Sequence, residues 1–150
     1  MSRLESVRIL LPAFALATVL LLGPGAADAG IGVKTGKYKG KTTQAAVASS
    51  FRVIAFTVKK GRVTLTREPT VARELCVSTP VFTLDGNPRQ KLGRNGTFTF
   101  THTFVGTKVD KIHGRFVGPD QIEGSAIYHF SGQDLCTEGR AEVSFTAKHK

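Results

Sequence analysis

Basic side chains gather at two places in the chain where their spacing could bind an anion. The six residues are Lys37, Lys39, Lys41, Lys59, Lys60 and Arg62. Side chains two positions apart in a strand point to one face, so the first three would form a basic stripe. Such a stripe suits anionic cell-wall polymer, acidic polysaccharide, phospholipid or nucleic acid. The structural alternative is that lysines on an outer strand discourage edge-to-edge pairing with other molecules.

The net charge favours the same class of partner. Residues 1–29 hold two arginines and two acidic residues, so all of the net charge of +10 lies on residues 30–150, as 19 Lys or Arg against nine Asp or Glu. Solubility is the alternative explanation of this charge.

Residues for catalysis are not grouped in the sequence. Ser125 follows Gly124 inside an expected strand and has no Gly-x-Ser-x-Gly turn around it, as a nucleophilic serine of that type requires. Four of the nine acids stand in turn-like sequence: Asp85, Asp120, Asp134 and Glu138. We therefore expect no enzymatic activity.

Three histidines lie on expected neighbouring strands, which makes a three-histidine metal site conceivable. They are His102, His113 and His129. Their separations along the chain do not bring them together, and His102 shares its strand face with phenylalanines, so we expect no metal and no other cofactor.

The first 29 residues read as an export signal. Arg3 and Arg8 precede a 14-residue apolar run, Ile9–Leu22, and Ala27-Asp28-Ala29 supplies a cleavage site. A membrane anchor would need roughly 20 apolar residues. We therefore predict a signal peptide over 1–29 and a secreted or extracytoplasmic domain (periplasm or cell wall) over 30–150, with no membrane span after cleavage.

The two cysteines, Cys76 and Cys136, predict one disulfide, because an isolated pair in an exported chain is usually oxidised. Neither has a second Cys or a His two to four residues away, as common zinc sites would require. A reactive thiol is the other alternative.

The strand expected to organise the fold is Thr97–Phe104, in which Phe98, Phe100, His102 and Phe104 alternate with threonines. This period of two is typical of a half-buried strand. The phenylalanine face should point into the core.

Other segments predict further strands and turns. Phe51–Lys59 is apolar on both faces and should be a central strand, and Lys60-Gly61 should turn it into a hairpin. Val81–Leu84 should be a short strand, and Arg89–Arg94 a polar connection. Gly114 and Gly124 should mark a bend if their strands pair.

About eight short strands with Gly and Pro turns predict an all-β, single-domain antiparallel sandwich or small barrel with one disulfide. A barrel of eight strands can hold a small apolar ligand, and five phenylalanines could line it: Phe98, Phe100, Phe104, Phe116 and Phe130. A solid core is the simpler use of these rings. Nucleic acid is disfavoured, because only Tyr38 stands among lysines as a stacking ring.

Several short motifs resemble a widespread, uncharacterised group of small secreted bacterial proteins. They are Gly36-x-Tyr38-x-Gly40-x-Thr42, Phe56-x-Val58-x-x-Gly61-x-Val63, Gly96-x-Phe98, Ile112-x-Gly114-x-Phe116, Gly124, Cys136-x-x-Gly139 and Phe145-Thr146-Ala147. The resemblance implies an extracytoplasmic β domain with one disulfide and carries over no catalytic residue. The expected function is thus binding of an anionic envelope or extracellular partner through the basic residues, with a barrel for a small apolar ligand as the alternative.

Overall fold

The computed structural model describes residues 32–45, 47–84, 86–103, 108–132 and 136–150. The predicted signal peptide and Phe104 lie outside these residues. Ten strands are present: β1 (Gly36–Thr42), β2 (Val53–Lys59), β3 (Arg62–Arg67), β4 (Ala72–Arg73), β5 (Cys76–Val77), β6 (Arg89–Lys91), β7 (Thr97–Thr103), β8 (Val109–Phe116), β9 (Gln121–Phe130) and β10 (Gly139–His149). The described part of the chain contains no helix.

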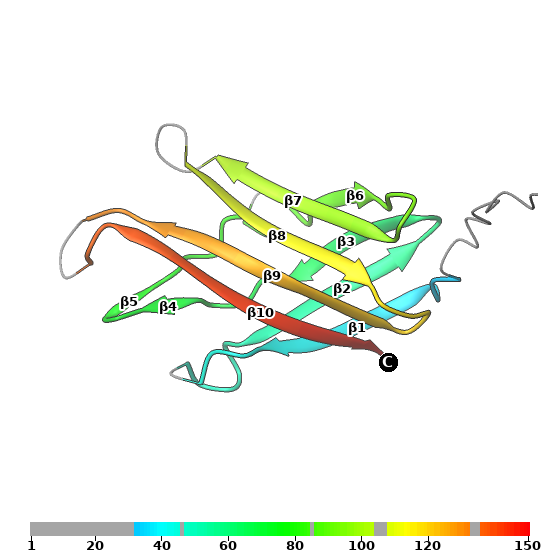
Figure 1. Cartoon of the computed structure of the whole chain (residues 1–150), viewed down its shortest axis with the longest axis horizontal. Coiled ribbons are helices and arrows are strands. Elements are labelled where there is room, and N and C mark those ends of the chain that lie inside the picture. Colours follow the sequence, from blue (N-terminus) through cyan, green and yellow to red (C-terminus); the bar gives the residue numbers. More distant parts are fainter. Residues whose placement is uncertain (1–31, 46, 85, 104–107, 133–135) are drawn as a thin grey trace, which may run out of the picture.

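Eight of the strands form one antiparallel sheet in the order β6-β3-β2-β1-β10-β9-β8-β7. The sheet curls until its two edge strands, β6 and β7, lie beside each other, so the fold is a nearly closed barrel (Figure 1). Strands β4 and β5 form a separate small hairpin at one end of the barrel. The expected all-β class is confirmed, and the barrel replaces the alternative of a two-sheet sandwich.

The phenylalanine face of β7 points inward as predicted. Phe98 and Phe100 are 4% and 1% exposed, whereas Thr101 and Thr103 on the other face are exposed. The rings of Phe98 and Phe100 lie near the ring of Phe56 in β2, at centroid distances of 5.3 and 6.5 Å. Phe145 of β10 contacts the same ring at 5.7 Å. The interior of an eight-stranded barrel is just wide enough for side chains to fill, and here aromatic rings fill it.

Gly114 and Gly124 stand opposite each other in β8 and β9, as the sequence suggested. A Cβ on Gly114 would lie 2.3 Å from the Phe98 ring, and one on Gly124 would lie 2.0 Å from the backbone oxygen of His113. The missing side chains therefore leave room for an aromatic ring and for close approach of the two backbones.

Two predictions about residues 81–94 are wrong. Val81–Leu84 is not a strand, because the backbone N–H groups of Val81, Phe82 and Thr83 donate to the carboxylate of Glu68 and not to a neighbouring strand. Arg89–Arg94 is not only a connection, since its first three residues pair with β3 as edge strand β6. Long-range contacts decided both segments. Phe51, expected at the start of the central strand, lies before β2 and is 59% exposed.

Candidate functional site: a basic groove

The tight turn Lys60-Gly61 sets the positions of the cations at the end of β2 and the start of β3. Both turn residues have positive φ, 50° and 68°, which is the conformation that a two-residue hairpin turn uses to match strand twist. Lys59 and Arg62 consequently face each other across the hairpin. The next strand, β6, places Lys91 opposite Arg62 and Arg89 opposite Thr64.

A hollow of about 390 Å³ lies on the outer face of the barrel at this place. Its walls are the exposed side chains of Lys59, Lys60, Arg62 and Arg89, together with Thr57 and Thr64. Residues from β2, β3 and β6 thus meet at one place, although Arg89 is 27 positions after Arg62 in the sequence.

A second hollow of about 380 Å³ adjoins the first and shares Thr57 with it. Its basic residues are Lys37 and Lys39 of β1 and Lys150 after β10, whose backbone N–H donates to the carbonyl oxygen of Lys37. We call the two hollows together the basic groove. It crosses the outer face of β6, β3, β2 and β1.

Small side chains form the floor of the basic groove. Ala55, Thr57, Thr64 and Thr66 line it between the basic residues. The rings of Tyr38 and Phe56 also border the second hollow, but both residues are 0% exposed and turn their rings into the core. The lining therefore offers cations and hydroxyl groups and no accessible aromatic face.

The seven cations of the groove are Lys37, Lys39, Lys59, Lys60, Lys150, Arg62 and Arg89. Within the described part of the chain, none of their side chains makes a hydrogen bond or an ion pair. Strands β1, β2, β3 and β6 contain eight Lys or Arg (three, one, two and two) and no Asp or Glu. Like charges also face each other directly, as in Lys59–Arg62 and Arg62–Lys91. Such pairs destabilise a sheet unless an anion lies between them.

The acidic residues that the structure describes are engaged away from the groove. Six accept a hydrogen bond from a partner: Glu68 from Tyr128, Glu74 from Thr137, Asp110 from His129, Glu123 from Gln121, Glu138 from Lys108, and Glu142 from Arg140. The seventh, Asp120, forms an ion pair with Lys34 at 3.8 Å. The exposed Glu138 carboxyl has its pKa lowered by the hydrogen bond and charge of Lys108. No Asp or Glu of the described residues lines either hollow of the groove.

Five of the six basic residues singled out in the sequence line the groove. The exception is Lys41, which lies on the same face of β1 but donates to the hydroxyl of Ser49 and borders neither hollow. Sequence reasoning missed Arg89 and Lys150. Arg89 could have been found only if the polar segment 89–94 had been assigned to a strand, since its alternation is too short to predict one.

The candidate catalytic and metal-binding residues are spread over different surroundings. His102 faces the Phe82 ring at 6.1 Å, His113 accepts from or donates to the Thr99 hydroxyl on the outer face, and His129 bonds the buried Asp110. Among the described residues, no three His, Cys, Asp or Glu are arranged to hold a metal ion. Ser125 stands opposite His113, but a threonine hydroxyl, not a carboxylate, bonds that histidine. A Ser-His-acid triad is not assembled there.

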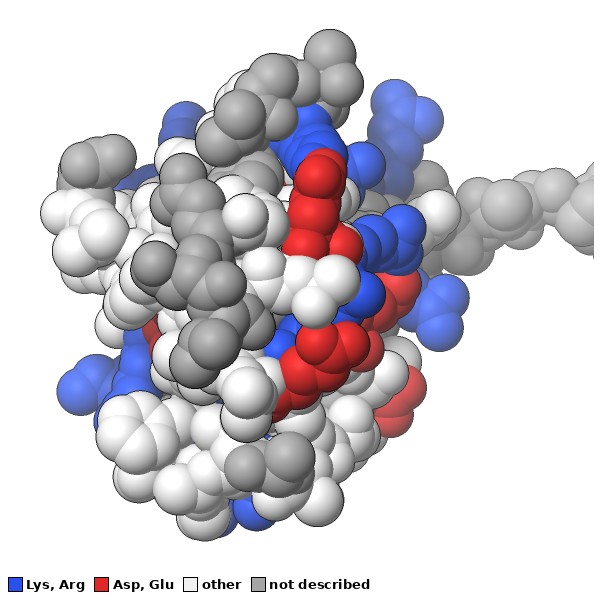
Figure 2. All heavy atoms as spheres, turned by 90° about the vertical axis from the view of Figure 1, so that its left-hand side faces the viewer, with Lys and Arg blue, Asp and Glu red and all other residues white. Residues whose placement is uncertain are grey.

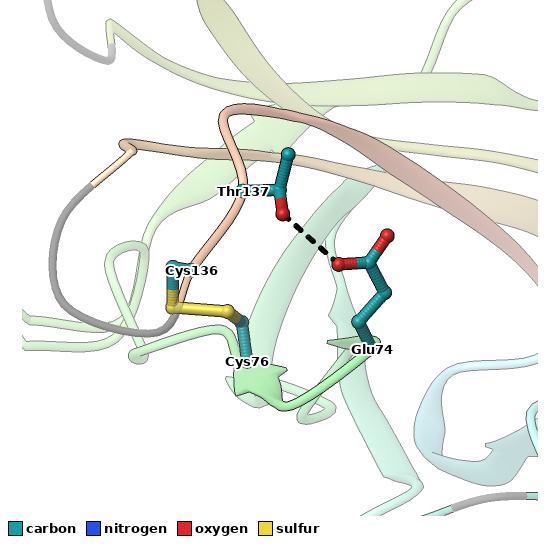
Figure 3. The surroundings of a disulfide bond; sticks show 4 residues. All are labelled: Glu74, Cys76, Cys136 and Thr137. Carbon is teal, nitrogen blue, oxygen red and sulfur yellow. Dashed lines mark hydrogen bonds between the residues drawn. A yellow bond between two sulfur atoms is a disulfide. The ribbon is translucent and has the colours of Figure 1, made fainter.

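The predicted disulfide is confirmed between Cys76 and Cys136, whose Cα atoms are 5.4 Å apart. It ties strand β5 to the segment that leads into β10 (Figure 3). Beside it, the Thr137 hydroxyl donates to the carboxylate of Glu74 at 3.1 Å. The bond therefore fixes the β4–β5 hairpin to the start of β10 at this end of the barrel.

That end of the molecule has a different surface character from the groove. Uncharged side chains cover much of its described surface, and acidic side chains gather beside basic ones on one side (Figure 2). A shallow depression of about 520 Å³ lies against the hairpin and is lined largely by apolar residues, including Phe51, Leu75 and Val77. The charge of the protein is thus not spread evenly around it.

No helix in the described ranges has the length and hydropathy needed to cross a membrane. Comparisons with protein-family models, with curated proteins and with solved structures find no match to this chain.

Proposed function

We propose that this protein is a non-enzymatic binding domain that works outside the cytoplasm and holds an extended anionic polymer of the cell envelope or its surroundings. The observation that carries the proposal is the basic groove, in which seven cations that have no partner among the described residues line two adjoining hollows. An extended partner suits this site better than a single small anion, because the cations follow a path across four strands.

Electrostatics gives the groove its preference for anions. Cations on one low-dielectric face add their potentials and raise the local concentration of a polyanion. The positive charges of Lys59 and Arg62, which face each other across β2 and β3, repel each other in the free protein. A bound anion would reduce that repulsion. Relief of the electrostatic repulsion between the groove cations therefore contributes favourably to the free energy of binding.

The alternative function, a barrel for a small apolar ligand, has less support. Phe56 touches three other phenylalanine rings inside the barrel, so the rings pack against one another where a ligand would have to lie. Packing of this kind contributes to the stability of the core. A titration with a fluorescent fatty acid that showed saturable binding would favour the alternative.

The test of the proposed function compares two variants that lose the same charge. Lys59→Gln/Arg62→Gln removes two groove cations, and Lys111→Gln/Arg115→Gln removes two exposed cations from β8, which lies across the barrel from β2. We expect the groove variant to bind polyphosphate-coated beads about 30-fold more weakly, at ~1 kcal/mol for each Lys or Arg near an anionic surface. The β8 variant should bind within about threefold of the natural protein.

Salt supplies a second measurement on the natural protein. If all seven cations are engaged, the logarithm of the association constant should fall with the logarithm of salt concentration with a slope of about −5, at ~0.7 for each contact with a single-stranded polyanion. Binding that ignores salt, or equal losses in the groove and β8 variants, would contradict the proposal.

The extracytoplasmic part of the proposal has its own check. Cleavage after Ala29 should yield an exported protein whose first residue is Gly30. N-terminal sequencing of the protein recovered from outside the cytoplasm measures this directly. Recovery of a chain that still begins with Met1 would show that the signal is not removed.

A further inference from the structure

Four cations reach the first hollow of the basic groove from different directions. Arg89 comes from β6, Arg62 from β3, Lys59 from β2, and Lys60 from the turn between β2 and β3. The hydroxyl-bearing side chains of Thr57 and Thr64 lie between them and face each other across β2 and β3. The hollow is therefore surrounded by hydrogen-bond donors on several sides.

This arrangement fits an anion whose oxygens point in several directions. A carboxylate presents two oxygens in one plane, whereas a phosphate or sulfate group presents its oxygens tetrahedrally. The guanidinium of arginine offers a planar fork of donors that matches such oxyanions bidentately, while a lysine acts as a point charge. Different oxygens of one phosphate or sulfate group can then contact the two arginine guanidinium groups, the two lysine ammonium groups and the two threonine hydroxyls that line the hollow.

We infer that the first hollow is a subsite for a tetrahedral oxyanion, phosphate or sulfate, carried by a linear polymer that continues into the second hollow. The inference rests on the proposed function and narrows it to one chemistry. Neighbouring strands lie ~4.8 Å apart, so Arg89 on β6 and Lys37 on β1 are separated by about 14 Å along this path. The polymer thus crosses the strands of the sheet and does not follow one of them.

The lining also indicates what the polymer lacks. Proteins that hold single-stranded nucleic acid without sequence preference stack bases on exposed aromatic rings. The two rings at the groove, Tyr38 and Phe56, are fully buried, and its floor consists of Ala55 and threonines. We therefore expect a slender polymer without bases, such as a polyphosphate, a polyol phosphate or a sulfated glycan.

The experiment measures the affinity of the natural protein for four probes at equal charge concentration and 50 mM salt. The probes are sodium polyphosphate, dextran sulfate, polygalacturonate and oligo(dT). We expect polyphosphate or dextran sulfate to bind about tenfold more tightly than polygalacturonate, because a tetrahedral group can accept from both arginine forks at once, whereas a planar carboxylate presents its two oxygens to one fork. The tighter of the two shows whether the subsite prefers phosphate or sulfate. Oligo(dT), whose phosphates are also tetrahedral but whose bases find no exposed ring on which to stack, should bind more weakly than polyphosphate.

A charge-preserving variant tests the arginine forks themselves. Arg62→Lys/Arg89→Lys should lower the affinity for the preferred oxyanion polymer about tenfold and that for polygalacturonate only about threefold, because the tetrahedral group loses two bidentate partners and the carboxylate loses one. Arg115→Lys/Arg140→Lys, on β8 and β10, is the matched control and should change neither affinity. Circular dichroism and thermal unfolding should be measured on both variants to check that they are folded.

The outcomes separate this inference from the proposed function. Equal affinity for phosphate, sulfate and carboxylate polymers, unchanged by Arg62→Lys/Arg89→Lys, would overturn the oxyanion subsite and leave polyanion binding in place. Oligo(dT) binding as tightly as polyphosphate would overturn the inference that the polymer lacks bases. No binding of any probe at 50 mM salt would overturn the proposed function and the inference together.

Discussion

The double variant Cys76→Ala/Cys136→Ala should lose about 4 kcal/mol of unfolding free energy, because the disulfide closes a 60-residue loop in the unfolded chain. A small domain is stable by only about 5–15 kcal/mol, so this loss is a large part of the total. Urea unfolding followed by circular dichroism measures it. The slope of the transition should rise, because the unfolded chain without its cross-link is less compact and exposes more surface.

The location of the bond predicts where the variant loosens first. The β4–β5 hairpin has only two residues in each strand, and apart from the disulfide its anchors include the bonds between Gln44 and Ala72 and between Ser78 and Val71. Hydrogen exchange should therefore accelerate in residues 70–78 before it does in β9. The groove is built on other strands, so polyanion binding at 25 °C should remain. An unfolding free energy within 1 kcal/mol of the natural protein would contradict the prediction.

The second large effect is expected at Glu68, which follows β3. Its hydrogen bonds hold residues 81–83 at the end of the barrel that also carries the β4–β5 hairpin. Its carboxylate accepts from the backbone N–H groups of Val81, Phe82 and Thr83 at 3.1, 3.0 and 3.3 Å. The hydroxyl of Tyr128 donates to it as well. Phe82, thus held, is 6% exposed and packs its ring on Tyr128 at 6.1 Å.

Glu68→Gln should lower the unfolding free energy by about 3 kcal/mol, because hydrogen bonds to a charged group contribute roughly 1.5–3 kcal/mol each and an amide NH₂ cannot accept from the loop. Glu123→Gln, on the exposed face of β9, is the matched control and should stay within about 0.5 kcal/mol. Exchange of the amides of residues 81–83 should become faster only in the first variant. Equal stability of the two variants would show that the loop is held by packing alone.

Tyr128 gives this end of the barrel a dependence on alkaline pH. Burial raises the pKa of Tyr128, and the charge and hydrogen bond of Glu68 raise it further. The folded state therefore holds this proton more tightly than the unfolded state, whose tyrosine titrates near pH 10. The stability linked to Tyr128 is present below about pH 10 and decreases as the pH rises above it. Burial also raises the pKa of Tyr38, the other tyrosine. Absorbance at 295 nm should consequently stay flat near pH 10 until the protein unfolds.

Local patterns in the sequence determined the parts of this protein that depend on neighbouring residues. A period of two placed Phe98 and Phe100 inside the barrel and Lys37, Lys39 and Lys41 outside it, because alternate side chains of a strand face opposite ways. The Lys60-Gly61 turn was equally predictable, since few residue pairs adopt two positive φ angles.

Tertiary structure alone decided the groove and the Glu68 loop. Arg89 meets Arg62, and Lys150 meets Lys37, only because the strand order places β6 beside β3 and β1 beside β10. Val81–Leu84 has a strand-like composition, yet the backbone N–H of Val81 donates to the carboxylate of Glu68, 13 residues earlier, and not to a neighbouring strand. Alternation says which face a side chain takes but not which strand lies next to it, because strand order depends on the packing of the whole chain.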